Sequence, residues 1–154
     1  MVEILRWRPL LEMLADIIGV NWTVLAGQLL QESGGHPDAI GDNGRAYGLA
    51  QIHAATKNNH AFSCGWDMEE LLNPIANLAV YIAEMIRLHR WLSSHWGERV
   101  RNPDWLLLSW NWGAGNVESH LNAGKGLDDI PPKLKEHLES YHEKTRQFLS
   151  LYNE

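Results

Sequence analysis

The spacing of apolar residues along the chain is typical of amphipathic helices. The longest pattern begins at Asn73-Pro74, a favoured cap and first residue, and continues over about five turns. Its apolar face comprises Ile75, Leu78, Ala79, Ile82, Met85, Ile86, His89 and Leu92. Shorter patterns precede Gly19 and span residues 134–152. Because alternating patterns extend over only a few residues, the sequence predicts an all-α fold with a long central helix and at most a small hairpin.

One carboxylate, Glu32, ends a predicted helix that stops at the glycine pair 34–35. On a helical period Glu32 shares a face with Leu25 and Leu29, so it is half turned toward the core. Apolar surroundings and the carbonyl end of a helix both disfavour the charged carboxylate and raise its pKa. A general acid that works near neutral pH needs such a pKa. The alternative is a surface glutamate that pairs with Arg45 or another base.

The segment after this helix is a glycine-rich loop. Residues 34–48 contain five glycines, a density that indicates tight turns and positive φ angles. The stretch from Tyr47 to Ile52 closes the loop, and we expect the amide of Gln51 to face the same cleft as Glu32. The alternative is that the Gln51 amide binds backbone carbonyl groups of its own loop.

A second predicted helix ends in the same way, beside glycines. It starts after Asn102-Pro103, and Asn111 lies near its end, just before Gly113. Trp110 and Trp112 flank this asparagine, and an aromatic face there could stack on a sugar ring. Packing of each tryptophan in the core is the equally weighted alternative.

Three sequence blocks, in this order, resemble murein-cleaving enzymes of the lysozyme-like superfamily, namely the soluble lytic transglycosylases and the goose-type lysozymes. The first is E-S-G-G at 32–35 followed by G-L-A-Q-I at 48–52. The second is N-P-x-x-N-L at 73–78, and the third is W-N-W-G-A-G-N-V at 110–117. The resemblance covers roughly residues 20–120. It implies a single lysozyme-like helical domain, expected to span residues 1–154, which acts on peptidoglycan.

The resemblance also implies roles for individual residues. Glu32 would be the general acid and base, and residues in or next to the matched blocks, together with His137 further along the chain, would contact the glycan. These expected substrate-binding residues are Ser33, Tyr47, Gln51, Trp110, Asn111, Trp112 and His137. Two departures concern the sugar site: Trp110 replaces the tyrosine of the A-Y-N-A-G block, and His137 stands where a further tyrosine is expected.

Two reaction outcomes are consistent with the resemblance, and both begin with cleavage between N-acetylmuramic acid and N-acetylglucosamine. A lytic transglycosylase uses one glutamate and forms a 1,6-anhydro ring, and we favour this outcome. A goose-type lysozyme delivers water instead, and Asp42 matches a loop aspartate implicated in that step. For Asp42 itself we favour the alternative that it shapes its own turn by bonding the loop backbone. A related chitin-cleaving enzyme, or an inactive glycan-binding or virion structural domain, is a more remote alternative.

The composition limits the partners. The formal net charge of −6 argues against nucleic-acid binding, which normally needs a basic patch. No apolar run reaches transmembrane length. Glu12 and Asp16 interrupt the first apolar stretch, which argues against a secretory signal peptide. We therefore expect synthesis in the cytoplasm and action on the bacterial wall, as for a phage lysin or virion-borne enzyme, or a domain of a longer protein. We also expect a monomer.

The sequence predicts no metal and no cofactor. Cys64 is the only cysteine, so an internal disulfide is excluded, and no activating partner for a nucleophile can be named. The spacing of His53, His60 and Cys64 fits no common zinc-ligand pattern.

Overall fold

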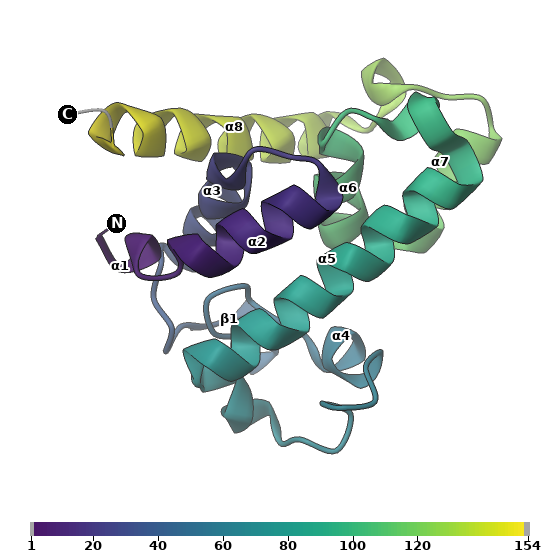
Figure 1. The fold of residues 1–154 in the computed structure, drawn as a ribbon. Helices are drawn as coiled ribbons and strands as arrows, with labels where there is room; N and C mark the ends of the chain where they lie inside the picture. Colours follow the sequence, from purple (N-terminus) through teal and green to yellow (C-terminus); the bar gives the residue numbers. More distant parts are fainter. Residues whose placement is uncertain (1, 153–154) are drawn as a thin grey trace.

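The computed structural model describes residues 2–152 and confirms the all-α fold with one small hairpin (Figure 1). The α-helices are α1 (Val2–Leu5), α2 (Arg8–Ile18), α3 (Trp22–Ser33), α4 (Ala54–Asn58), α5 (Pro74–Trp96), α6 (Asp104–Asn111), α7 (Ala114–Asn122) and α8 (Pro132–Tyr152). The 3₁₀ helices are η1 (Asp42–Gly44), η2 (Met68–Leu72), η3 (Gly97–Val100) and η4 (Leu127–Asp129). Strands β1 (Ile40–Gly41) and β2 (Ala46–Tyr47) form an antiparallel pair.

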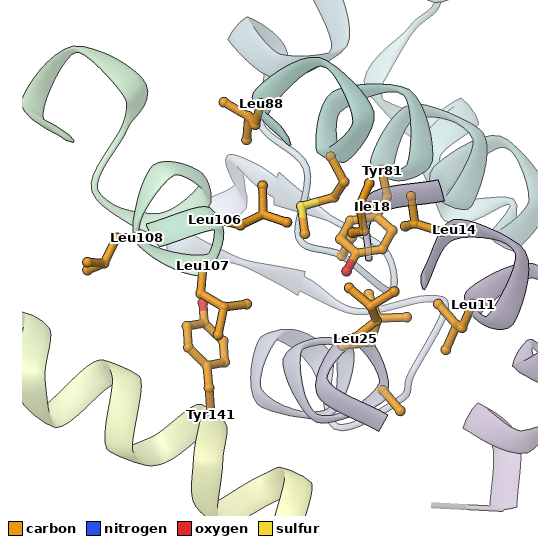
Figure 2. Packing of buried hydrophobic residues seen from close by; sticks show 14 of the residues in the cluster. Leu11, Leu14, Ile18, Leu25, Tyr81, Leu88, Leu106, Leu107, Leu108 and Tyr141 are labelled. Carbon is orange, nitrogen blue, oxygen red and sulfur yellow. The ribbon is translucent and has the colours of Figure 1, made fainter. Parts of the chain in front are cut away.

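Helix α3 is buried along most of its length because α2 and α8 both pack against it. The two helices α3 and α8 come close together at Gly27, where a Cβ atom would collide with Thr145 of α8. Glycine therefore allows the two helix backbones to come together at this point, despite its cost within a helix. Helix α8 lies along one side of the molecule, and α5 runs diagonally across it (Figure 1). The core lies between these helices and includes the rings of Tyr81 and Tyr141 (Figure 2).

The buried face of α5 differs in part from the predicted apolar face. Ile75 is 58% exposed, whereas Asn77 and Glu84 are buried. The reason is that α5 also supports the loop region, whose backbone groups need partners. Asn77 accepts a hydrogen bond from the Ala50 N–H (2.9 Å) and donates to the Tyr47 and Leu71 carbonyl groups (2.8 and 2.9 Å). Its amide thus fastens the glycine-rich loop to α5.

Glu84 holds the second part of the loop region, residues 53–66. Its carboxylate accepts hydrogen bonds from Arg87 at 2.6 and 3.0 Å and lies 2.9 Å from Nε2 of His60. In the same loop, the buried Lys57 ammonium donates to the Ser63 and Cys64 carbonyl groups (3.2 and 3.1 Å). These buried charges are paired or fully hydrogen-bonded, as burial requires.

No single helix within residues 2–152 is both long and apolar enough to cross a membrane. Helices α2 and α3 meet that criterion only when they are taken together, and they are bent by 120° relative to each other.

Candidate active site

The local sequence around α3 places Glu32 in the last turn of that helix, as predicted. The Asn21 side chain caps the start by accepting a hydrogen bond from the Thr23 N–H at 3.0 Å. Gly34 ends the helix with a φ of 66°, and its N–H donates to the Leu30 carbonyl at 2.9 Å. The Glu32 side chain leaves the helix where the glycine-rich loop begins.

The Glu32 carboxyl group is half-buried and is surrounded by neutral hydrogen-bond donors. The hydroxyl of Tyr141 donates to Oε1 of Glu32 at 2.6 Å, and the Trp110 side chain also favours the charged carboxylate. Burial has the larger effect, so the net result is a raised pKa of Glu32. Within the described residues Glu32 forms no ion pair, and Arg45 instead pairs with Asp42. The alternative of a Glu32–Arg45 pair is therefore wrong.

Tyr141 reaches Glu32 from α8, and sequence reasoning missed this role. Its ring is only 1% exposed and extends from α8 toward α6 (Figure 2). Burial and the nearby negative charge of Glu32 raise the pKa of Tyr141, so its hydroxyl remains a donor. The sequence had placed Tyr141 in the apolar stripe of the last helix. The available signal was chemical, because a buried tyrosine hydroxyl needs a polar partner.

A second buried tyrosine, Tyr81 on α5, packs against a residue of the site. The Tyr81 hydroxyl donates to Oε1 of Gln28 at 2.8 Å, and Gln28 lies one helical turn before Glu32. The Tyr81 ring packs edge-on against the indole of Trp110, with centroids 5.2 Å apart. Burial and the charge of Glu32 both raise the pKa of Tyr81. Tyr81 and Gln28 were also missed, and Tyr81 packs against the Trp110 ring that lies beside Glu32.

The solvent-facing side of the site contains Asn111 and His137. Nδ2 of Asn111 lies 2.9 Å from Nε2 of His137, and the ring of His137 packs edge-on against Tyr141 with centroids 5.3 Å apart. The Asn111 side chain also lies near the Tyr141 hydroxyl and offsets a small part of the rise in the pKa of that tyrosine. Thus Trp110, Asn111 and His137, three of the expected site residues, come together with Glu32.

Trp112 and Ser33 are engaged elsewhere. The Trp112 ring packs edge-on against His120 at 5.5 Å and lies against the core, in line with the packing alternative. The Ser33 hydroxyl donates to the Leu29 carbonyl and accepts from the Gly35 N–H, both at 3.2 Å. Its role in this structure is to complete the end of α3.

In the glycine-rich loop, the Gln51 amide binds its own loop. It donates to the carbonyl groups of Gly48 (2.9 Å) and Ala39 (3.2 Å), in agreement with the backbone-binding alternative. Tyr47 pairs through its backbone with Ile52 and lines a surface cavity of about 350 Å³ together with His53. Contact of either side chain with a glycan stays a prediction.

Asp42 lies at the tip of the hairpin with a φ of 47°. Its carboxylate pairs with Arg45 at 2.9 Å and lies 3.6 Å from Nε2 of His53. The Asp42 carbonyl accepts hydrogen bonds from the backbone N–H and Nε of Arg45. These contacts correspond to the turn-shaping alternative for Asp42.

The part of the chain that the structure describes contains no cluster of three or more histidine, cysteine, aspartate or glutamate side chains able to hold a metal ion. Cys64 is exposed, and its thiol contacts the Ala61 carbonyl.

A half-buried carboxyl group with a raised pKa, next to exposed polar side chains, is suited to acid-catalysed cleavage of a glycosidic bond. Residues 10–130 match the family model of the transglycosylase SLT domain. The chain therefore belongs to this family of lytic transglycosylases, which act on peptidoglycan. No curated protein matches the chain. The matched segment ends before α8, so only the structure links His137 and Tyr141 to Glu32.

Proposed function

We propose that the protein cleaves the β-1,4 bond between N-acetylmuramic acid and N-acetylglucosamine in peptidoglycan, with Glu32 as the general acid and then the general base. The observation that carries this proposal is the environment of Glu32. Burial raises its pKa, and its hydrogen-bond donor Tyr141 is neutral. The carboxyl group can therefore hold a proton closer to neutral pH than an exposed glutamate can.

The first step is transfer of the Glu32 proton to the glycosidic oxygen as the bond to C1 of the muramic residue breaks. The N-acetyl group of that sugar stabilises the positive charge that develops at C1. The carboxylate left on Glu32 is stabilised by the Tyr141 hydroxyl and the Trp110 side chain, which both favour its charged form. These donors ease proton release without fixing the carboxylate permanently in its charged state.

In the second step the Glu32 carboxylate removes the proton of the C6 hydroxyl of the muramic residue. O6 then attacks C1, and a 1,6-anhydro ring closes while Glu32 regains its proton. The cycle consumes no water and needs one carboxyl group. The pairing of Asp42 with Arg45 in the hairpin supports this outcome over hydrolysis with Asp42 as a water-placing base.

Mass spectrometry of soluble muropeptides tests the proposal. Purified peptidoglycan is digested with the wild-type protein or with Glu32→Gln, which keeps the size of the side chain but cannot transfer the proton. We expect anhydromuramic ends from the wild type and none from the variant. Reducing muramic ends would indicate hydrolysis, as in goose-type lysozymes. Equal products from both proteins, or none from the wild type, would contradict the role of Glu32. The phage context and the monomeric state stay predictions.

A further inference from the structure

We propose that His137 is a positioning residue that holds Asn111 beside Tyr141 and Glu32, and that it does so only while its imidazole ring is neutral. This inference rests on the proposed function of Glu32, because it assigns to His137 a control over that site. The inference is based on the 2.9 Å contact between Nδ2 of Asn111 on α6 and Nε2 of His137 on α8.

The direction of this hydrogen bond determines where the imidazole proton lies. An amide nitrogen can only donate, so Nε2 of His137 must accept, and the single ring proton of the neutral form resides on Nδ1. When the ring becomes protonated, Nε2 also carries a hydrogen and two donors face each other. The Asn111 amide must then rotate or move away.

A change at Asn111 is transmitted to Glu32 through one residue. The Asn111 side chain is close enough to the Tyr141 hydroxyl to affect its pKa, and Tyr141 donates to Glu32 at 2.6 Å. The His137 ring also packs directly against the Tyr141 ring. Protonation of His137 therefore disturbs the placement of Asn111 and of the tyrosine that binds the acid.

The groups around His137 favour its neutral form. Desolvation and then the positive charge of Lys133, on the same helix, lower the pKa of His137. Tyr141 is neutral, and α6 presents the neutral Asn111. The two nearby carboxylates have other partners: Asp104 of α6 pairs with His142 at 3.0 Å, and Glu32 of α3 binds the Tyr141 hydroxyl. The contact with Asn111 should thus persist to pH values below the ordinary range for histidine titration.

Position 137 also departs from the family resemblance. The family resemblance expects a tyrosine at position 137, but the tyrosine that binds Glu32 is Tyr141, one helical turn later. Position 137 is thereby free to carry a side chain that titrates in a range where tyrosine does not. Histidine here adds pH sensitivity while the hydroxyl donor to Glu32 is retained.

Nitrogen-15 NMR of the histidine rings tests the contact without reference to catalysis. We expect the Nδ1–H tautomer for neutral His137 and a pKa below that of free histidine. In Asn111→Ala the pKa of His137 should rise, because the lost hydrogen bond stabilised the neutral ring. His89 is an internal control: it is half-buried, its pKa is also lowered, and its resonances should not change in Asn111→Ala. An Nε2–H tautomer, or no response to Asn111→Ala, would overturn the proposal.

The pH profile of peptidoglycan cleavage tests the consequence. His137→Gln keeps a neutral acceptor that does not titrate, so the acid limb of its profile should move to lower pH than in the wild type. His137→Ala, which lacks an acceptor, should reduce cleavage about two- to tenfold near neutral pH. His89→Gln should have the wild-type profile. An unchanged acid limb in His137→Gln would overturn the proposal. A wild type with no cleavage at any pH would contradict the proposed function, whereas the NMR result would still decide the contact.

Discussion

Two glutamates with limited access to solvent, Glu32 on α3 and Glu84 on α5, have opposite electrostatic environments. Glu32 accepts a hydrogen bond from the neutral Tyr141, and burial raises its pKa. Glu84 binds Arg87 and lies 2.9 Å from His60, and these partners outweigh burial and lower its pKa. The same residue type is thus prepared to exchange a proton in one place and to hold a permanent charge in the other.

The opposite pKa shifts of Glu32 and Glu84 arise from their hydrogen-bonding partners and not from the degree of burial alone. Neutral donors partly offset the cost of ionising a buried carboxyl group. A nearby cation such as Arg87 instead makes the ionised form the favoured one. The buried charge of Glu84 fastens the loop 53–66 to α5, where a fixed ion pair is useful. An ion pair at Glu32 would keep its carboxyl group ionised and unable to donate a proton. Glu32 forms no such pair within the described part of the chain.

The largest expected effect on activity comes from Glu32→Gln. Loss of the proton donor should lower cleavage of peptidoglycan by at least about 10²–10⁴-fold. Because the folded pKa of Glu32 is raised, its contribution to stability is present below the unfolded pKa and is lost as the pH rises through the folded pKa. Glu32→Gln should therefore unfold at the same or a higher temperature than the wild type at neutral pH. A strong loss of stability would mean that Glu32 is a structural residue.

Glu84→Gln should give the reverse result. Loss of the Glu84 carboxylate removes its hydrogen bonds to Arg87 and its contact with His60, so the free energy of unfolding should fall by about 1–3 kcal/mol, because Arg87 is 44% exposed and stays partly solvated without its partner. Cleavage below the melting temperature should fall much less than in Glu32→Gln. The folded pKa of Glu84 is lowered, so its stabilising effect is present above the unfolded pKa and is lost as the pH falls through the folded pKa.

Denaturant unfolding between neutral and acidic pH measures this difference. The wild type should lose more stability in acid than Glu84→Gln. Glu98→Gln is the control, because Glu98 is 85% exposed and pairs with Arg101 at the surface. Equal pH dependence in the wild type and in Glu84→Gln would refute the assignment of a permanent charge to Glu84.

Tyr141→Phe removes the hydroxyl that favours the Glu32 carboxylate. The pKa of Glu32 should rise further, since the lost hydrogen bond favoured the charged carboxylate. The alkaline limb of the pH–rate profile should move to higher pH, because Glu32 must be protonated to act as an acid. Tyr152→Phe, at a residue that packs against Trp22, should leave the limb in place. A shift to lower pH in Tyr141→Phe would contradict the account.

Asp42→Asn should have the smallest effect. Asparagine tolerates the positive φ of this position, so the hairpin should persist and cleavage should fall less than about threefold. A loss of a hundredfold, accompanied by reducing ends among the products, would instead assign water placement to Asp42. Asp42 would then be a second catalytic carboxylate beside Glu32.

The sequence was sufficient for the position of Glu32 and Asn111, because Gly34 ends α3 and Gly113, with a φ of 94°, follows Trp112 at the end of α6. It was not sufficient for Tyr141, Tyr81 or Glu84. Each lies in a helix at a position where periodicity predicts burial or exposure but not a polar partner from a distant element. Glu32 lies 109 residues from Tyr141 and His60 lies 24 residues from Glu84, and only folding brings these pairs together.

Gln51 shows a different limit of sequence reasoning: the sequence singled out the residue but did not determine the direction of its side chain. Its place in a loop block that resembles the family suggested a side chain directed at the glycan, yet the amide is engaged by the Gly48 and Ala39 carbonyl groups. A loop with several positive φ angles leaves backbone carbonyl groups without regular partners, and a nearby amide satisfies them. Sequence alone does not separate these two uses of one side chain.

The most direct measurement is a carbon-13 NMR titration of the glutamate side-chain carboxyl groups in the wild-type protein. Glu32 should titrate above the exposed glutamates and Glu84 below them, and Glu32→Gln should remove only the first of these two resonances. If Glu32 titrates with or below the exposed glutamates, it is ionised under the same conditions as a surface carboxylate. The account of Glu32 as an acid prepared by burial among neutral donors would then be wrong.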